Sequence, residues 1–224
     1  MQNDFWLERW EQEEIVFHQN EINPYLCEYW QELHLAHDSL IFVPLCGKSR
    51  DMLWLRQQGH PVVGVELSDI AVQAFFQENG YIPKQITCGK FGCYEADGIH
   101  ILCGDFFELN KEDLLSKDSR VKVSATYDRA ALIALPQKMR ERYVRHLTSI
   151  LPPATQILLI TLDYLQTEMQ GPPFSVSADE VKALCREHAE VHLLAQLDVL
   201  AKNPRFQQRG LSRLQENIFL LKLH

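Results

Sequence analysis

The sequence predicts an α/β protein built on a mostly parallel sheet, and residues 40–66 carry the prediction. Residues 40–45 are apolar and partly β-branched, as in a strand that is buried on both faces. Residues 50–58 place apolar side chains at helical spacing, and residues 62–66 form a second valine-rich strand. Strand, helix and strand in this order predict a βαβ unit with a right-handed crossover.

Composition limits the classes of function. The chain has 224 residues, 46% of them hydrophobic and 23% charged, which is typical of one globular domain with a buried core. Its 22 basic and 30 acidic residues give a net charge of −8, which disfavours nucleic acids and anionic membranes as partners. We expect neither a membrane span nor a signal peptide, because long apolar runs are missing and the N-terminus is acidic.

The six cysteines contain no CxxC pair, which disfavours the common zinc-binding and redox motifs. Their positions are typical of reduced cysteines in a cytosolic protein. We therefore expect no disulfide and no metal site.

The turn after the first strand and the acid after the second predict a nucleoside site. Ligands of open parallel sheets lie beyond the carboxyl ends of the strands, and the backbone of Gly47 can approach a ligand closely there. Glu66 follows about 20 residues later, the offset at which an acid binds a ribose in nucleoside-binding folds. The alternative is an ordinary surface glutamate at the end of a strand.

The sequence of this turn does not match either of two phosphate-binding motifs. A P-loop would need a glycine at Phe42, and the dinucleotide motif GxGxxG would need glycines at Leu45 and Arg50. A ligand without a pyrophosphate therefore fits better. A nucleotide-dependent oxidoreductase on the same topology stays open as a less favoured alternative.

Two helices are expected before the first strand, at residues 4–14 and 25–33. Trp6 and Trp10 lie one turn apart on the first helix, where they either pack the helix against the core or cover a flat ligand. His18 is either a structural histidine or a base.

The middle of the chain predicts a helix at residues 69–78 with Ser68 as its N-cap, and a hairpin at residues 84–103. Asp105 follows the end of this hairpin. Its carboxylate could accept a hydrogen bond from an adenine amino group or from the turn backbone, or it could cap a short helix at 109–115.

A strand at residues 122–127 is followed by Asp128 and Arg129. Arg129 either clamps an anionic substrate or pairs with Asp128 at the surface. Residues 171–174, Gly-Pro-Pro-Phe, form a stiff loop that is a candidate rim of the substrate pocket.

The last third predicts further elements in βα order. They are a helix at 136–147, a strand at 156–162, a helix from Ser177 to Glu187 with a Ser177–Glu180 capping box, a basic loop at 203–210, and strands at 191–200 and 217–223. Two strands with little helix between them predict an antiparallel hairpin at one edge of the sheet.

Beyond these patterns, the chain resembles bacterial thiopurine S-methyltransferases, within the class I S-adenosylmethionine-dependent methyltransferases. The resemblance covers nearly the whole chain and includes FWLERW at 5–10, FHQNEINPYL at 17–26, PLCGK within FVPLCGKSRDM at 42–52, GVELS at 64–68, LCGDFFEL at 102–109, DRAAL within YDRAALIALP at 127–136, GPPFSVS at 171–177 and NPRFQQRGLSRL at 203–214.

The resemblance implies a three-layer, Rossmann-like fold whose seven-stranded, mostly parallel sheet ends in an antiparallel C-terminal edge hairpin. It further implies a single domain over residues 1–224, with N-terminal lid helices in 1–35 and the core in 36–224.

The implied activity is methyl transfer from S-adenosyl-L-methionine to the sulfur of a thiopurine or another aromatic thiol, with S-adenosyl-L-homocysteine as the second product. The enzyme would be a cytoplasmic monomer that acts by positioning, without a catalytic side chain. Selenium or tellurium compounds are alternative acceptors, and a cofactor-binding module without activity is a further alternative. The residues carried over are Trp10, Leu45, Glu66 and Arg129 as cofactor contacts, Trp6, Gly47, Asp105 and Phe106 as the rest of the cofactor pocket, and Phe17, Arg205 and Arg129 near the acceptor.

Overall fold

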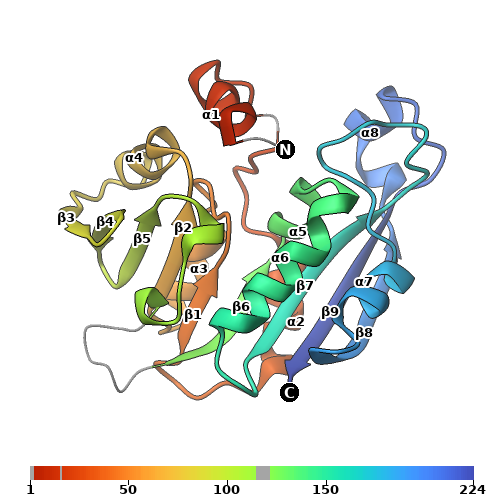
Figure 1. The fold of residues 1–224 in the computed structure, drawn as a ribbon. Helices are drawn as coiled ribbons and strands as arrows, with labels where there is room; N and C mark the ends of the chain where they lie inside the picture. Colours follow the sequence, from red (N-terminus) through yellow and green to blue (C-terminus); the bar gives the residue numbers. More distant parts are fainter. Residues whose placement is uncertain (1–2, 16, 115–121) are drawn as a thin grey trace.

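A computed structural model describes residues 3–15, 17–114 and 122–224. Within these ranges nine strands form one sheet in the order β3-β4-β5-β2-β1-β6-β7-β9-β8 (Figure 1). The strands are β1 Leu40–Val43, β2 Val62–Glu66, β3 Lys84–Cys88, β4 Phe91–Ala96, β5 Ile99–Cys103, β6 Val123–Asp128, β7 Gln156–Asp163, β8 Ala189–Asp198 and β9 Gln215–Leu223.

The sheet is larger and more mixed than the predicted seven-stranded, mostly parallel sheet. Residues 84–103, expected to form a hairpin, form three consecutive strands, and β5 pairs in parallel with β2 while β4 pairs antiparallel with β5. The five central strands β5-β2-β1-β6-β7 are parallel, and both edges are antiparallel. The predicted C-terminal edge hairpin is confirmed by β8 and β9.

Helices cover both faces of the sheet, so the predicted three layers are present (Figure 1). Alternate residues of a strand face opposite sides. Phe42 packs in one cluster with Tyr143 of α6, whereas Ile41 packs with Trp30 and Phe75 on the other face.

The helices are α1 Asn3–Glu11, α2 Pro24–Tyr29, α3 Asp51–Gln57, α4 Asp69–Glu78, α5 Ala131–Ala134, α6 Gln137–Ile150, α7 Ala178–Cys185 and α8 Pro204–Gln208. Four 3-10 turns are also described: η1 Trp30–Leu33, η2 Phe106–Glu108, η3 Glu112–Leu114 and η4 Leu200–Lys202.

The two N-terminal helices have different positions. α1 lies beyond the carboxyl ends of the parallel strands, as a lid would (Figure 1). α2 and η1 instead bury Leu26, Trp30 and Leu33 against the sheet. Asn23 starts α2, because its side-chain oxygen accepts hydrogen bonds from the amides of Tyr25 (2.9 Å) and Leu26 (3.3 Å). The two segments therefore lie in different places, and the role of residues 1–35 as a lid stays a prediction.

Local geometry explains where several elements end. The strand expected at residues 40–45 ends at Val43, because Leu45 has a left-handed backbone with φ of 47°. The first helix ends at Glu11, and Glu13 is left-handed as well. Ser177 caps α7 as predicted, but the carboxylate of Glu180 pairs with Arg140 at 2.6 Å instead of completing a capping box.

Two further expectations about elements are wrong, and one short helix was not predicted. The basic segment 203–210, expected as a loop, contains α8, and α5 was not predicted. The expected helix at 109–115 is replaced by η2 and η3, and its last residue lies outside the described ranges.

The cysteine prediction is also wrong, because the sulfur atoms of Cys88 and Cys93 are bonded to each other. Neighbouring antiparallel strands bring the two residues together.

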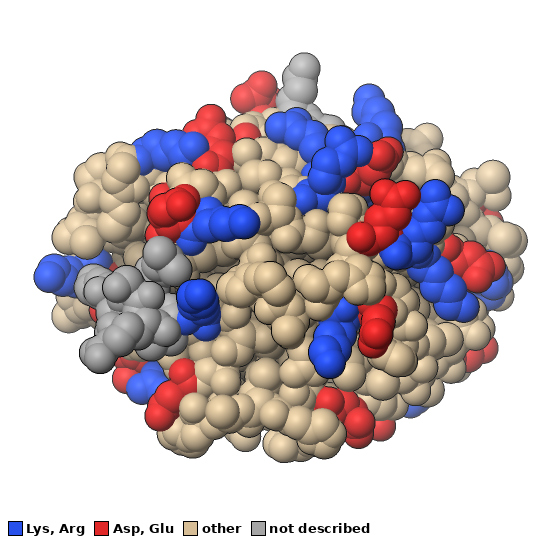
Figure 2. All heavy atoms as spheres, turned by 60° about the horizontal axis from the view of Figure 1, so that its bottom comes forward, with Lys and Arg blue, Asp and Glu red and all other residues tan. Residues whose placement is uncertain are grey.

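The surface mixes charges of both signs. On the face in Figure 2, lysines and arginines lie beside aspartates and glutamates. No helix built from the described residues combines the length and the apolar character needed to span a bilayer.

Candidate active site

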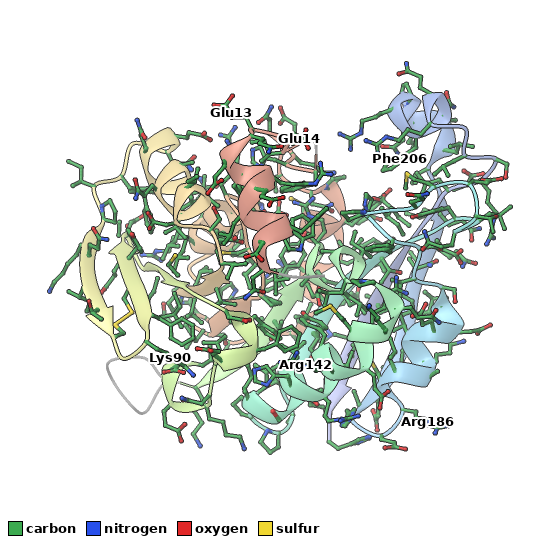
Figure 3. The ribbon with its side chains drawn as sticks, turned by 45° about the horizontal axis from the view of Figure 1, so that its top comes forward. Glu13, Glu14, Lys90, Arg142, Arg186 and Phe206 are labelled. Carbon is green, nitrogen blue, oxygen red and sulfur yellow. A yellow bond between two sulfur atoms is a disulfide. The ribbon has the colours of Figure 1, made fainter. Side chains whose placement is uncertain are left out.

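A cavity of about 430 Å³ lies beyond the carboxyl ends of the central strands, between the α1 region and α8. Its size is within the range typical of small-molecule and cofactor sites. Glu14 and Phe206, labelled in Figure 3, both line it. All ten residues predicted to contact cofactor or acceptor line this cavity: Trp6, Trp10, Phe17, Leu45, Gly47, Glu66, Asp105, Phe106, Arg129 and Arg205.

The turn after β1 is tied to the end of β2. The amide of Gly47 donates to Glu66 Oε2 at 2.8 Å, and the amide of Cys46 donates to the carbonyl of Val65 at 2.9 Å. Leu45 and Gly47 both have left-handed backbones, a conformation that costs energy for leucine and little for glycine. Such backbone strain is typical of functional sites.

Glu66 is a buried acid, so the alternative of an ordinary surface glutamate is wrong. Its two carboxylate oxygens accept hydrogen bonds from the amides of Gly47 and Ser68, each at 2.8 Å. Burial raises the pKa of Glu66, and the backbone donors act in the opposite direction. A carboxylate has about four lone-pair positions, so further acceptor capacity is left for hydroxyl groups in the cavity.

Aromatic rings form the wall of the cavity beside α1. The Phe17 ring stands edge-to-face against Trp6 and Trp10, with centroids 5.5 Å and 5.7 Å apart. Trp10 is buried, and a Cβ atom added to Gly47 would lie 3.4 Å from its Cζ2 atom. Trp10 thus both packs helix α1 against the glycine turn and faces the cavity. Phe17, expected beside the acceptor, contacts both tryptophans expected beside the cofactor.

Asp105 connects the end of β5 to α1. Its Oδ1 atom accepts from the amide of Phe107 at 2.9 Å, and its Oδ2 atom accepts from Asn3 Nδ2 at 3.0 Å. Asp105 thus accepts from the turn backbone at the start of η2 and does not cap a helix at 109–115, while a bond to an adenine amino group stays a prediction. Phe106 is buried with its ring centroid 5.0 Å from that of Tyr143.

Arg129 pairs with Asp51, and the alternative of a surface pair with Asp128 is wrong. Arg129 Nη2 lies 3.2 Å from Asp51 Oδ2. Asp51, the first residue of α3, also accepts from Tyr127 Oη at 3.0 Å and from the amide of Asn23 at 2.8 Å. The sequence analysis missed Asp51, although this residue lies just after the turn that contains Gly47.

Asp128 has its own buried partners. Its carboxylate accepts from Tyr143 Oη at 2.6 Å and from the amides of Ala131 (3.1 Å) and Leu132 (3.3 Å). It therefore fixes the start of α5 and the position of α6.

The opposite wall combines residues of β7 and β9 with segments outside the sheet. Residues 171–173 of the predicted rim loop line the cavity, whereas Phe174 does not. The exposed Arg205 on α8 also lines it, with its guanidinium carbon 5.4 Å from the Phe206 ring centroid. Sequence reasoning missed Arg209 and Glu216, which line the same wall. Burial raises the pKa of Glu216.

His18 also lines the cavity. Burial lowers its pKa, and the charges of Lys48 and Arg129 act in the same direction, so the imidazole is neutral near pH 7. Lys48 lines the cavity as well, and its ammonium pairs with Glu78 Oε1 at 2.7 Å.

The same fold occurs in solved methyltransferases. The structure matches the 1,6-didemethyltoxoflavin-N1-methyltransferase of Burkholderia thailandensis with a TM-score of 0.64 at 12% identity, covering 99% of this chain and 86% of that one. An S-adenosylmethionine-dependent methyltransferase of Anabaena variabilis matches with a TM-score of 0.62 at 14% identity, covering 99% and 95%. These likenesses establish the fold.

Sequence comparison identifies the family. The chain is 61% identical to a thiopurine S-methyltransferase of Nitrosospira multiformis, over 99% of this chain and 98% of that protein. It is 49% identical to one of Azotobacter vinelandii, over 99% of each chain. The family model described as thiopurine S-methyltransferase matches residues 1–224. The predicted resemblance is confirmed, and this chain belongs to the thiopurine S-methyltransferase family of enzymes.

Proposed function

We propose that this chain transfers the methyl group of S-adenosyl-L-methionine to the sulfur of a thiopurine or another aromatic thiol. The observation that carries the proposal is Glu66, a buried carboxylate at the end of β2 that lines one cavity together with Trp10 and Arg129. An acid in this position suits a ribose, the indole suits a cationic or flat group, and the guanidinium suits an anionic acceptor.

The proposed cofactor side of the site is the wall that contains Glu66 and Trp10. Glu66 is proposed to accept the ribose hydroxyls, and the turn at Leu45 and Gly47 to lie along the ligand, where glycine leaves space. Trp6, Trp10, Asp105 and Phe106 complete this side. When bound, the sulfonium supplies an activated methyl group. The Trp10 ring suits a sulfonium because the face of an indole attracts cations.

The acceptor side needs to hold a sulfur atom in line with the methyl group. Arg129 and Arg205 are proposed to favour an anionic thiolate, with Phe17 against its ring. A thiolate is already nucleophilic, so we propose that no side chain has to act as a base. Alignment of this kind contributes roughly 7–11 kcal/mol in well-oriented reactions. A cytoplasmic location and a monomeric state stay predictions.

The test is calorimetric titration of the purified protein with S-adenosyl-L-homocysteine. Wild type should bind with a dissociation constant of about 1–10 μM, a free energy of about −7 to −8 kcal/mol. Glu66→Ala should bind at least about 100-fold more weakly, and Glu190→Ala, which changes an exposed acid on β8, should bind like wild type. Absence of binding by wild type would refute the proposed donor.

The acceptor is tested separately by mass spectrometry of methylated products. Thiopurines, simple aryl thiols, and selenium or tellurium oxyanions are offered with S-adenosyl-L-methionine. We expect S-methylated thiols. Cofactor binding without transfer to any thiol would refute the proposed acceptor class and leave the donor intact.

A further inference from the structure

Three side chains with metal-binding atoms meet on the edge of the sheet that the methyl-transfer site does not use. Cys88 on β3, Cys93 on β4 and His100 on β5 each offer one ligand atom, and these atoms all lie within 4.8 Å of one another. Cys93 is buried, and the other two are half-buried, so one side of the group is open to solvent. None of the three residues lines the cavity.

The strand register places these side chains together. Cys93 lies opposite Ile86 on one side and opposite Leu102 on the other. Cys88 is two residues from Ile86, and His100 is two residues from Leu102. Because alternate residues share a face of the sheet, all three side chains point to the same face. Diagonal neighbours on adjacent strands are close enough for their side chains to meet.

The two cysteines are joined as a disulfide, visible as the yellow bond in Figure 3 on the strands that the turn at Lys90 connects. We propose that, once this disulfide is reduced, Cys88, Cys93 and His100 bind a Zn²⁺ ion. Two thiolates and an imidazole are a ligand set that zinc prefers, and a water molecule can supply the fourth position.

The spacing suits a tetrahedral ion. With Zn–S and Zn–N distances of about 2.3 Å and 2.0 Å, ligand atoms of a tetrahedral site are roughly 3.3–3.8 Å apart, inside the 4.8 Å limit that the three atoms satisfy. The Cα atoms of the two cysteines are 5.9 Å apart, so rotation of the side chains can open this space without moving the strands. Imidazole has two nitrogens, so His100 can bind zinc through one and keep a hydrogen bond through the other.

The chemistry makes disulfide and metal mutually exclusive. A dithiol reductant donates two electrons and two protons to the Cys88–Cys93 bond and becomes a disulfide itself. Zinc then displaces both thiol protons and binds the two thiolates, while His100 binds as the neutral imidazole. Oxidation of the pair would release the ion. The site therefore exists only in the reduced protein.

The experiment measures metal binding by the full-length protein. The protein is reduced with dithiothreitol, freed of reductant under nitrogen, and titrated with Co²⁺ and then with Zn²⁺ against a chromophoric chelator. Reduced wild type should bind one ion, with the thiolate-to-cobalt absorption and visible bands of a tetrahedral site. Cys88→Ser and His100→Gln should bind at least about 100-fold more weakly, since loss of even an outer partner of a metal ligand costs 10–100-fold.

The controls separate this site from other thiols and from misfolding. Cys27→Ser removes an exposed cysteine away from the group and should bind zinc like wild type. Each variant is checked for folding by its melting temperature. In wild type, zinc should also protect Cys88 and Cys93, but not Cys27, from alkylation. Equal zinc affinity in oxidised and reduced protein, unchanged affinity in Cys88→Ser, or no binding by the reduced protein would each overturn the proposal.

Discussion

The two walls of the cavity are built in different ways. On the β1–β2 side, Glu66 is buried and held between the amides of Gly47 and Ser68. On the β6–α8 side, Arg205 is an exposed side chain on a five-residue helix. Glu66 is held by backbone amides of the turns that follow β1 and β2, whereas Arg205 stands on a short helix outside the sheet. This difference suits a constant ligand on one side and variable acceptors on the other.

Two acids show that a place at a strand end does not define a role. Glu66 and Asp128 both end central strands, both are buried, and both accept hydrogen bonds from two backbone amides. Glu66 lines the cavity, whereas Asp128 faces Tyr143 and is not part of the lining. The direction of the side chain decides whether the acid faces the cavity or caps a helix.

The largest effect is expected at Asp51, which joins the two walls. Asp51→Ala leaves the mostly buried Arg129 without its ion pair and the amide of Asn23 without its acceptor. Removing one partner of a buried pair costs about 3–5 kcal/mol, so the free energy of unfolding in urea should fall by about 3 kcal/mol or more. Glu141→Ala is the control. It breaks an exposed pair with Arg145 and should cost at most about 1 kcal/mol. Equal losses would contradict the role of Asp51.

Asp128 should make stability depend on pH. Burial raises its pKa to about 6, above the value of about 3.9 in unfolded chains. Between these values the folded protein keeps a proton that the unfolded chain has lost. The stabilising contribution of Asp128 is therefore complete below about pH 4 and is lost as the pH rises through 6.

Asp128→Asn removes this titration and keeps an oxygen for the amides of Ala131 and Leu132. From about pH 4.5 to about pH 7.5, the stability of the variant relative to wild type should increase by about 2 kcal/mol. Urea unfolding at both pH values measures the difference. Parallel pH profiles would show that Asp128 is not responsible.

A smaller, one-sided effect is expected at Arg205. Arg205→Ala should raise the KM of the acceptor about 10-fold, or about 1.4 kcal/mol, because a positive charge beside the thiolate is lost. The dissociation constant of S-adenosyl-L-homocysteine should not change, since Glu66 and Trp10 lie on the other wall. Arg186→Ala, which changes an exposed residue after α7, is the control (Figure 3). Unchanged acceptor kinetics would remove Arg205 from the site.

The smallest effect is expected at His18. With a thiol that is ionised at the assay pH, His18→Gln should change kcat by no more than about twofold, because a thiolate needs no base. Rates measured across a series of thiols with different pKa values provide the test. A loss of about 100-fold with ionised thiols would instead make His18 important for the chemistry.

Sequence patterns predicted the elements whose structure depends on residues close together in the chain. The βαβ unit from β1 to β2, the Ser68 and Ser177 caps and the glycine turn follow from residue periodicity and backbone preference. Gly47 and Glu66 were predicted from the spacing of the βαβ unit, the full set of site residues came from the family resemblance, and all of them line the cavity.

Contacts between distant segments could not be predicted in this way. The Asp51–Arg129 pair and the Cys88–Cys93–His100 group depend on which strands lie side by side and in what register. Spacing along the chain carries no such information. The same holds for the two extra strands, which join the sheet because β4 pairs with β5.

The two outer strands also affect how molecules meet one another. β3 is exposed along most of its length and begins with Lys84, and β8 has an irregular register between Leu193 and Ala195. Charges and bulges on edge strands disfavour pairing with a strand of another molecule. We therefore expect the two edge strands to resist pairing between molecules, so that the protein stays in solution at high concentration.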